Sequence, residues 1–169
     1  NMMTTQSLSA GTLALGAEFQ AGLVEGTPLL MNLHQSVGLR GGLDLYAREG
    51  IGLAQGAGVY LGAGIKWTIL SGNKKRPGLA LLAGGHYVTG AYGGADACFY
   101  IDYAISRVTP YLALDLNLDF PNDVDAKLGL LGGVRIGVVQ NVEWFIEGQV
   151  GFTGNPKNHL VATGPRIKI

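Results

Sequence analysis

Large apolar residues recur at every second position along much of this chain. From Leu13 to Leu23 the alternate residues are Leu, Leu, Ala, Phe, Ala and Leu, whereas the residues between them are small or polar. The same rhythm runs through residues 59–69, 112–120, 128–138 and 144–152. Because successive side chains of a β-strand point to opposite faces, this period predicts strands with one apolar face and one small or polar face.

Turn-forming residues divide the chain into ten such segments. We expect strands at residues 12–23, 30–39, 43–48, 56–70, 79–88, 97–105, 111–120, 127–138, 143–152 and 159–167, with residues 1–11 as an N-terminal segment before the barrel. Strands of about ten residues, tilted by about 45°, span roughly 25 Å, the height of the apolar band of an outer-membrane barrel. The pattern therefore predicts an all-β fold, a closed antiparallel transmembrane β-barrel with an up-and-down meander. The third segment is short and the last is irregular, so eight strands remain an alternative to ten.

The composition decides which way the apolar faces point. Only 14% of the residues are charged, compared with about 25% in a typical soluble domain, and glycine accounts for 28 residues. In a soluble barrel the apolar faces would point inward, and the face left for water would be mostly Gly, Ala and Ser. Turned inward, these small residues fill a narrow lumen, and the few ions there pair with one another. We therefore expect the apolar faces to meet lipid.

The opposite faces then carry the side chains of the lumen. The residues expected to line it are Glu18, Gln20, His34, Arg40, Asp44, Tyr46, Tyr60, Lys66, Asp102, Asp115, Asn117, Lys127, Arg135, Glu147 and Gln149. Alternating glycines such as Gly62 and Gly64 are expected to fill the lumen or to allow close backbone approach. Cys98, the only cysteine, is expected to face the lumen as an inert thiol.

Aromatic residues and connections sort onto two sides of this barrel. The interfacial aromatics are expected to be Trp67 and Trp144 on one side, and Tyr92, Phe120 and Phe152 on the other. Both termini are expected on the side of the connections at 40–42, 71–77, 106–110 and 140–142. The opposite side has the connections at 24–28, 49–55, 89–96, 121–126 and 154–158. Short turns on one side are typical of outer-membrane barrels, in which that side is periplasmic.

Segments such as Gly38-Leu39-Arg40-Gly41-Gly42-Leu43-Asp44-Leu45-Tyr46 and residues 58–67 carry this alternation. On these patterns nearly the whole chain resembles the small outer-membrane β-barrel proteins, the broad group that includes OmpA-like and opacity-like barrels. The resemblance implies an integral protein of the Gram-negative outer membrane, surrounded by membrane lipid. The chain departs from that group in its short outer loops and in ending at Ile169 instead of a terminal aromatic residue. Residues 1–11 have neither Lys nor Arg and no continuous apolar run, so they do not read as a signal peptide.

A histidine and a serine two residues apart form the most tempting catalytic pattern. His34 and Ser36 share a strand face, so the histidine could act as a base for the serine hydroxyl. The pair resembles the His-x-Ser of outer-membrane lipid A deacylases, which would make Glu49 the orienting carboxylate. The expected phase turns both side chains into the lumen, away from lipid, which favours a structural role. The connection that contains Asp119, Asp123 and Asp125 lacks the glycine and distal glutamate of an EF-hand. We therefore expect no catalytic residue, no cofactor and no metal.

Charge narrows the choice of partner. The net charge of zero argues against nucleic acid. The basic residues in the predicted periplasmic turns are Arg40, Lys74, Lys75, Arg76 and Arg107. The acidic residues in the predicted outer loops are Glu25, Glu49, Asp96, Asp123 and Asp125. The first hypothesis is a structural or scaffolding barrel with protein partners in the cell envelope. The second is a narrow passive pore for small solutes or ions, and a lipid A-modifying hydrolase comes third.

Overall fold

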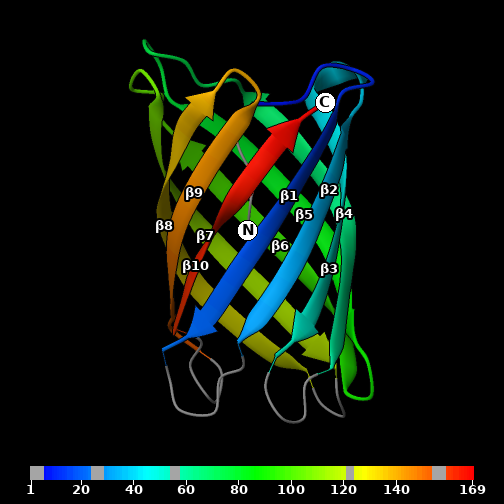
Figure 1. The fold of residues 1–169 in the computed structure, drawn as a ribbon. Helices are drawn as coiled ribbons and strands as arrows, with labels where there is room; N and C mark the ends of the chain where they lie inside the picture. The colour runs from blue at the N-terminus through cyan, green and yellow to red at the C-terminus, as the bar shows by residue number, and fades with distance from the viewer. Residues whose placement is uncertain (1–5, 24–28, 54–57, 121–123, 154–158) are drawn as a thin grey trace.

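The computed structural model describes residues 6–23, 29–53, 58–120, 124–153 and 159–169. These residues form ten antiparallel strands, and the sheet closes because β1 pairs with β10 as well as with β2 (Figure 1). The strands are β1 (Leu13–Gly22), β2 (Leu30–Gly38), β3 (Leu43–Gly52), β4 (Val59–Leu70), β5 (Gly78–Val88), β6 (Tyr92–Asp102), β7 (Val108–Phe120), β8 (Asp125–Val139), β9 (Val142–Gly151) and β10 (His159–Lys168). Strands adjacent in sequence are adjacent in the sheet, so the predicted up-and-down barrel is confirmed, with ten strands and not eight. No helix in the described part of the chain is long and apolar enough to cross a membrane.

Two strands differ from their predicted bounds by four residues or more at one end. β3 continues to Gly52 instead of ending at residue 48, because its register with β2 and β4 is unbroken. β6 begins at Tyr92 instead of residue 97, because the glycine-rich stretch that suggested a loop pairs with both β5 and β7. A side chain at Gly94 would collide with the imidazole ring of His86. Glycine therefore serves close packing inside the sheet at this position.

The two ends of the barrel differ in their connections. We call the end with the β2–β3, β4–β5, β6–β7 and β8–β9 connections the tight-turn end, and the opposite end the loop end. The C-terminus lies at the tight-turn end, the upper end in Figure 1. There Leu13 and Ile169 exchange two backbone hydrogen bonds, of 3.0 and 2.7 Å. The start of the first strand and the end of the last are thus joined at this end.

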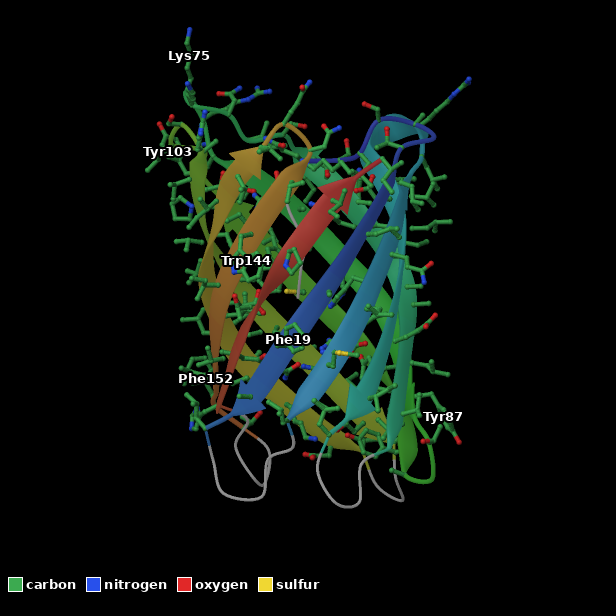
Figure 2. All side chains as sticks on the ribbon, viewed as in Figure 1. Phe19, Lys75, Tyr87, Tyr103, Trp144 and Phe152 are labelled. Atoms are coloured by element: carbon green, nitrogen blue, oxygen red, sulfur yellow. The ribbon has the colours of Figure 1, made fainter. Side chains whose placement is uncertain are left out.

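The outward face of every strand carries large apolar side chains (Figure 2). Leu15, Ile65 and Leu112 are 38%, 49% and 46% exposed. By contrast, Lys66 and Asp115 on inward positions are 2% and 8% exposed. The barrel therefore reverses the usual arrangement of a soluble protein, because its apolar side chains are outside and its ions are inside.

Outward aromatic residues gather toward both ends. Tyr103 and Trp144 lie toward the tight-turn end, and Phe19, Tyr87 and Phe152 lie toward the loop end (Figure 2). All five side chains are exposed. Such paired groups are the arrangement of the aromatic girdles that flank the apolar band of membrane barrels.

The predicted interfacial aromatics include one error. Trp67 and Phe120 are exposed on the outward face, 51% and 48% respectively. Tyr92 instead turns into the lumen, where its ring lies edge-on to that of His86 with 5.9 Å between centroids. The prediction for Tyr92 was wrong because it placed this residue in a loop, whereas Tyr92 is the first residue of β6 and shares the inward phase of that strand.

Candidate functional site

The lumen gathers the polar side chains of all ten strands and is the candidate site. Of the residues predicted to line it, all except Arg40 occupy inward positions, which alternate with the exposed apolar positions of their strands. Arg40 is exposed in the 3₁₀ turn Arg40–Gly42 between β2 and β3. The lumen assignment of Arg40 is therefore corrected, because the strand phase from which it was extrapolated ends at Gly38.

The loop-end half of the lumen contains a cavity of about 320 Å³. His86 stands in its wall and lies 2.9 Å from Asp96 Oδ1 through Nδ1 and 3.0 Å from Asp119 Oδ1 through Nε2. The ammonium group of Lys127 also binds Asp119, at 2.5 Å. Three strands, β5, β6 and β7, are thus tied together through one imidazole. The cavity is polar, but the charged side chains in its wall already hold ion-pair or hydrogen-bond partners, as Arg48 does with Glu18 and Asp115 with Asn117.

The middle of the lumen contains a second polar network around Glu18, which is fully buried. Arg48 Nη2 and Asn32 Nδ2 donate to Glu18 Oε1 at 3.1 and 2.8 Å. His34 Nε2 lies 3.2 Å from Glu18 Oε2. A carboxylate with this many donors is held in one orientation, and the cost of its burial is offset by the pairing.

Beside this network, a cluster of apolar and aromatic side chains fills the lumen. Leu82, Tyr100, Tyr111 and Leu131 come from β5, β6, β7 and β8 and are at most 7% exposed. Tyr46 reaches the cluster from β3. The hydroxyl of Tyr111 donates to Glu147 Oε2 at 2.9 Å, which satisfies its polar end. The cluster therefore joins one side of the barrel wall to the other at mid-height.

Glycines make room for these tyrosines. A side chain at Gly64 or Gly84 would collide with the hydroxyl of Tyr46, and one at Gly133 would collide with the ring of Tyr111. The sequence predicted that lumen glycines fill space or allow close approach. At these three positions the glycines allow a tyrosine side chain to approach the backbone closely. Part of the high glycine content is thus explained by the space that aromatic rings need in a narrow barrel.

The tight-turn half of the lumen is crossed by ion pairs. Lys66 Nζ and Asp44 Oδ2 are 2.5 Å apart, and Arg135 Nη2 donates to Asp102 Oδ2 at 2.7 Å. Glu143 on β9 lies 2.9 Å from Lys168 Nζ, and its second oxygen is 3.7 Å from Arg166 Nη1. Nearly all of these side chains are buried or half-buried.

The described part of the N-terminal segment, residues 6–11, folds against this half of the lumen. Leu8 is 6% exposed, and its N–H donates to Asp44 Oδ1 at 3.1 Å. Lys66 Nζ donates to the carbonyl oxygen of Gln6 at 2.9 Å. A side chain at Gly38 would collide with Leu8 and with the carbonyl oxygen of Ser9. The Asp44–Lys66 pair therefore holds this segment over the tight-turn end of the lumen.

Several lumen residues were not predicted from the sequence. Arg48 and Arg166 continue the inward phase of β3 and β10 and were available from that phase alone. His86 was not predicted because its partners, Asp96 and Asp119, come from two other strands, and only the register shows that they meet. Asp96 was assigned to an outer loop, which is corrected here because it lies within β6.

The acidic residues predicted in outer loops need two further corrections. Glu49 lies within β3, and Asp125 is the first residue of β8. Asp119, which was grouped with Asp123 and Asp125 in one connection, lies on the inward face of β7. Glu25 and Asp123 fall outside the described residues. The described residues contain no group of three or more His, Cys, Asp or Glu side chains arranged to hold a metal ion.

The catalytic arrangement of His34, Ser36 and Glu49 considered from the sequence is not formed in the structure. His34 and Ser36 both occupy inward positions on β2. The carboxylate nearest to His34 belongs to Glu18, because Glu49 occupies an outward position on the neighbouring strand. The proposed orienting role of Glu49 was therefore wrong. The alternation along β3 places its side chain on the opposite side of the sheet from His34.

No family model matches the sequence, and no curated protein does. Among solved structures, the chain is similar to the N-terminal β-barrel domain of Pseudomonas aeruginosa OprF, with a TM-score of 0.50 and 9% identity over 95% of this chain and 98% of that one. It is also similar to the KdgM porin, with a TM-score of 0.51 and 11% identity over 91% of this chain and 98% of that one. At such identities the likeness concerns the fold alone. The chain has the fold of a small outer-membrane β-barrel.

Proposed function

We propose that this chain is an integral outer-membrane barrel that acts as a structural subunit and does not hold an open pore. The exposed apolar faces of its ten strands and the two aromatic groups support the membrane location. Membrane lipid then covers the outward face, and protein partners in the envelope are part of the proposal. The argument for a structural role comes from the contents of the lumen.

The observation that carries this role is the closed lumen. Leu82, Tyr100, Tyr111 and Leu131 pack together at mid-height with at most 7% exposure. Closer to the tight-turn end, the Asp44–Lys66 pair and the buried Leu8 lie across the passage. A solute entering from the loop end would have to displace both layers. A barrel closed in this way suits anchoring or scaffolding better than transport.

The orientation is also part of the proposal. Exposed Lys74, Lys75, Arg76 and Arg107 lie in the turns of the tight-turn end. Short turns belong to the periplasmic side in outer-membrane barrels. We therefore place both termini in the periplasm. Cleavage by trypsin after Lys75 in inverted membranes, but not in intact cells, is the expected result. Cleavage after Lys75 in intact cells would contradict this orientation.

Conductance across planar bilayers tests the closed lumen. The parent barrel is expected to give no stable unitary current. Tyr100→Ala combined with Tyr111→Ala removes two large side chains from the cluster, and deletion of residues 1–11 removes the segment that carries Leu8. A chain with both changes is expected to conduct, which also proves that the assay detects inserted barrels. Stable unitary currents from the parent protein would overturn the structural role.

The second candidate function is a narrow pore, and the loop-end cavity favours it. A volume of about 320 Å³ is in the range of ligand cavities and admits small solutes from that end. Parent currents that change when Glu18 or Arg135 is neutralised would support this function in place of the first. The hydrolase hypothesis is weaker still, because the carboxylate nearest to His34 is shared with Arg48. Unchanged lipid A after incubation with the purified barrel is the expected result.

A further inference from the structure

One charged residue breaks the apolar outward face of the barrel. Glu49 on β3 is exposed and occupies an outward position between Ala47 and Ile51. Away from the strand ends, it is the only Asp, Glu, Lys or Arg on the outward face of the described strands. Among the described residues, no hydrogen bond or ion pair of Glu49 is found, whereas the lumen carboxylates are partnered.

Glu49 lies among apolar side chains in the loop-end half of the outward face, in the register row of Leu61 and Tyr87. Its cross-strand neighbours are Leu33 on β2 and Leu61 on β4, which are 48% and 45% exposed. Ile51 and Leu53 lie between Glu49 and the loop end, and they are 53% and 54% exposed. A carboxylate that faces lipid at such a position is unfavourable, and ionisable residues in membrane segments are usually partnered.

A second polar residue, Gln35, and a row of small residues lie next to Glu49 on the outward face. Gln35 pairs with Ala47, and Leu33 with Glu49, so Gln35 and Glu49 are diagonal neighbours on β2 and β3. Ala47 also pairs with Ala63, which continues the small-residue row toward β5. Small residues let another backbone approach closely inside a membrane. An amide donor, a carboxylate acceptor and a flat patch thus share one outward face.

We propose that this face, Gln35, Ala47, Glu49 and Ala63, is the interface through which two copies of the chain pack side by side in the membrane. A two-fold axis beside β3 brings the Gln35 amide of each copy within reach of the Glu49 carboxylate of the other. The pairing is self-complementary, as a two-fold interface requires. On the outward face of the described strands, away from their ends, Gln35 is the only amide side chain and no Lys or Arg is present, so the hydrogen-bond donor for Glu49 comes from this same face. This inference rests on the proposed membrane location and names the partner in the proposed scaffold.

Disulfide cross-linking in native-like lipid tests the interface. The native Cys98 is 2% exposed inside the barrel, so an introduced outward cysteine is the accessible thiol. Ala47→Cys is expected to give a covalent dimer on mild oxidation. Leu130→Cys, on the outward face of β8 across the barrel, is the matched control and is expected to stay monomeric. A monomeric Ala47→Cys, or equal cross-linking of both variants, would overturn the proposal.

Substitution of the polar pair tests its chemistry. In the chain carrying Ala47→Cys, Glu49→Leu is expected to raise the dimer dissociation constant by about tenfold or more, equivalent to about 1.4 kcal/mol. Glu49→Gln keeps an acceptor for the Gln35 amide and is expected to retain most of the dimer. Leucine at this site suits lipid, so a folding defect is not expected, and heat-modifiable gel mobility checks it. A dimer unaffected by Glu49→Leu, or another protein bound at this face in place of the second copy, would contradict the inference.

The two proposals fail separately. Conductance by the parent barrel would refute the closed lumen and leave the dimer untouched. A monomeric, silent barrel would refute the dimer and leave the closed lumen in place. The mass of the barrel in mild detergent, measured beside the planar-bilayer recordings, separates these results.

Discussion

Removing the carboxylate of Asp102 is expected to destabilise the barrel strongly. Arg135 Nη2 donates to Asp102 Oδ2 at 2.7 Å, and the two side chains are 7% and 3% exposed. Asp102→Ala leaves the guanidinium of Arg135 buried inside the barrel. Its remaining acidic neighbour is Glu143, whose Oε2 lies 3.8 Å from Nη1. Loss of one partner from a buried ion pair costs about 3–5 kcal/mol. We expect a value near the lower end because Glu143 remains as a weaker partner.

The double variant Asp102→Leu/Arg135→Met separates pairing from charge. Removing both ions leaves neither one unpaired, and apolar replacement of a buried pair is often neutral or stabilising. The double variant is therefore expected to be at least as stable as the parent. Reversible urea unfolding in lipid vesicles, followed by the fluorescence of Trp67 and Trp144, gives the free energy of unfolding, with the m-value as a control. A single variant as stable as the parent would refute the claim that pairing holds these ions in the lumen.

Three further predictions follow from the same architecture. Leu114→Arg places a charge on the outward face and is expected to cost about 2–4 kcal/mol in vesicle unfolding, whereas Leu114→Ala costs less. Gly38→Leu forces residues 8 and 9 away from the barrel, so limited proteolysis is expected to cut the N-terminal segment faster than in the parent; an unchanged rate would contradict its docking. His86→Leu removes a group shared by two lumen carboxylates and is expected to lower the free energy of unfolding by about 1–3 kcal/mol, measured in the same urea assay.

The period-two pattern predicted most of the fold because it records which face of each strand meets which environment. The alternation that predicted an outward position for Leu114 also predicted an inward position for Asp115, and the exposures of both side chains agree with it. Glu49 was misplaced for a different reason. The predicted strand ended at residue 48, four residues before the end of β3, so a lipid-facing carboxylate looked like a loop residue.

The alternation of apolar and polar residues along each strand does not predict which side chains meet across strands. The meeting of His86 with Asp96 and Asp119 depends on the register of three strands. That register is in turn set by hairpins such as Thr89–Ala91, where Gly90 adopts a φ of +72°. The docking of Leu8 over Asp44 likewise depends on tertiary contacts, since residues 6–11 carry no strand pattern. Local alternation cannot specify either arrangement.

The most direct test places a spin label on the outward face of β7, in a Cys98→Ala background. Leu114 points outward at 47% exposure, and Ala113 points inward at 2%. In vesicles, a label at Leu114→Cys is expected to collide readily with dissolved oxygen and hardly at all with a water-soluble nickel chelate. A label at Leu114→Cys that is reached by the nickel chelate as easily as one in a turn at the barrel rim would mean that water, and not lipid, surrounds the barrel.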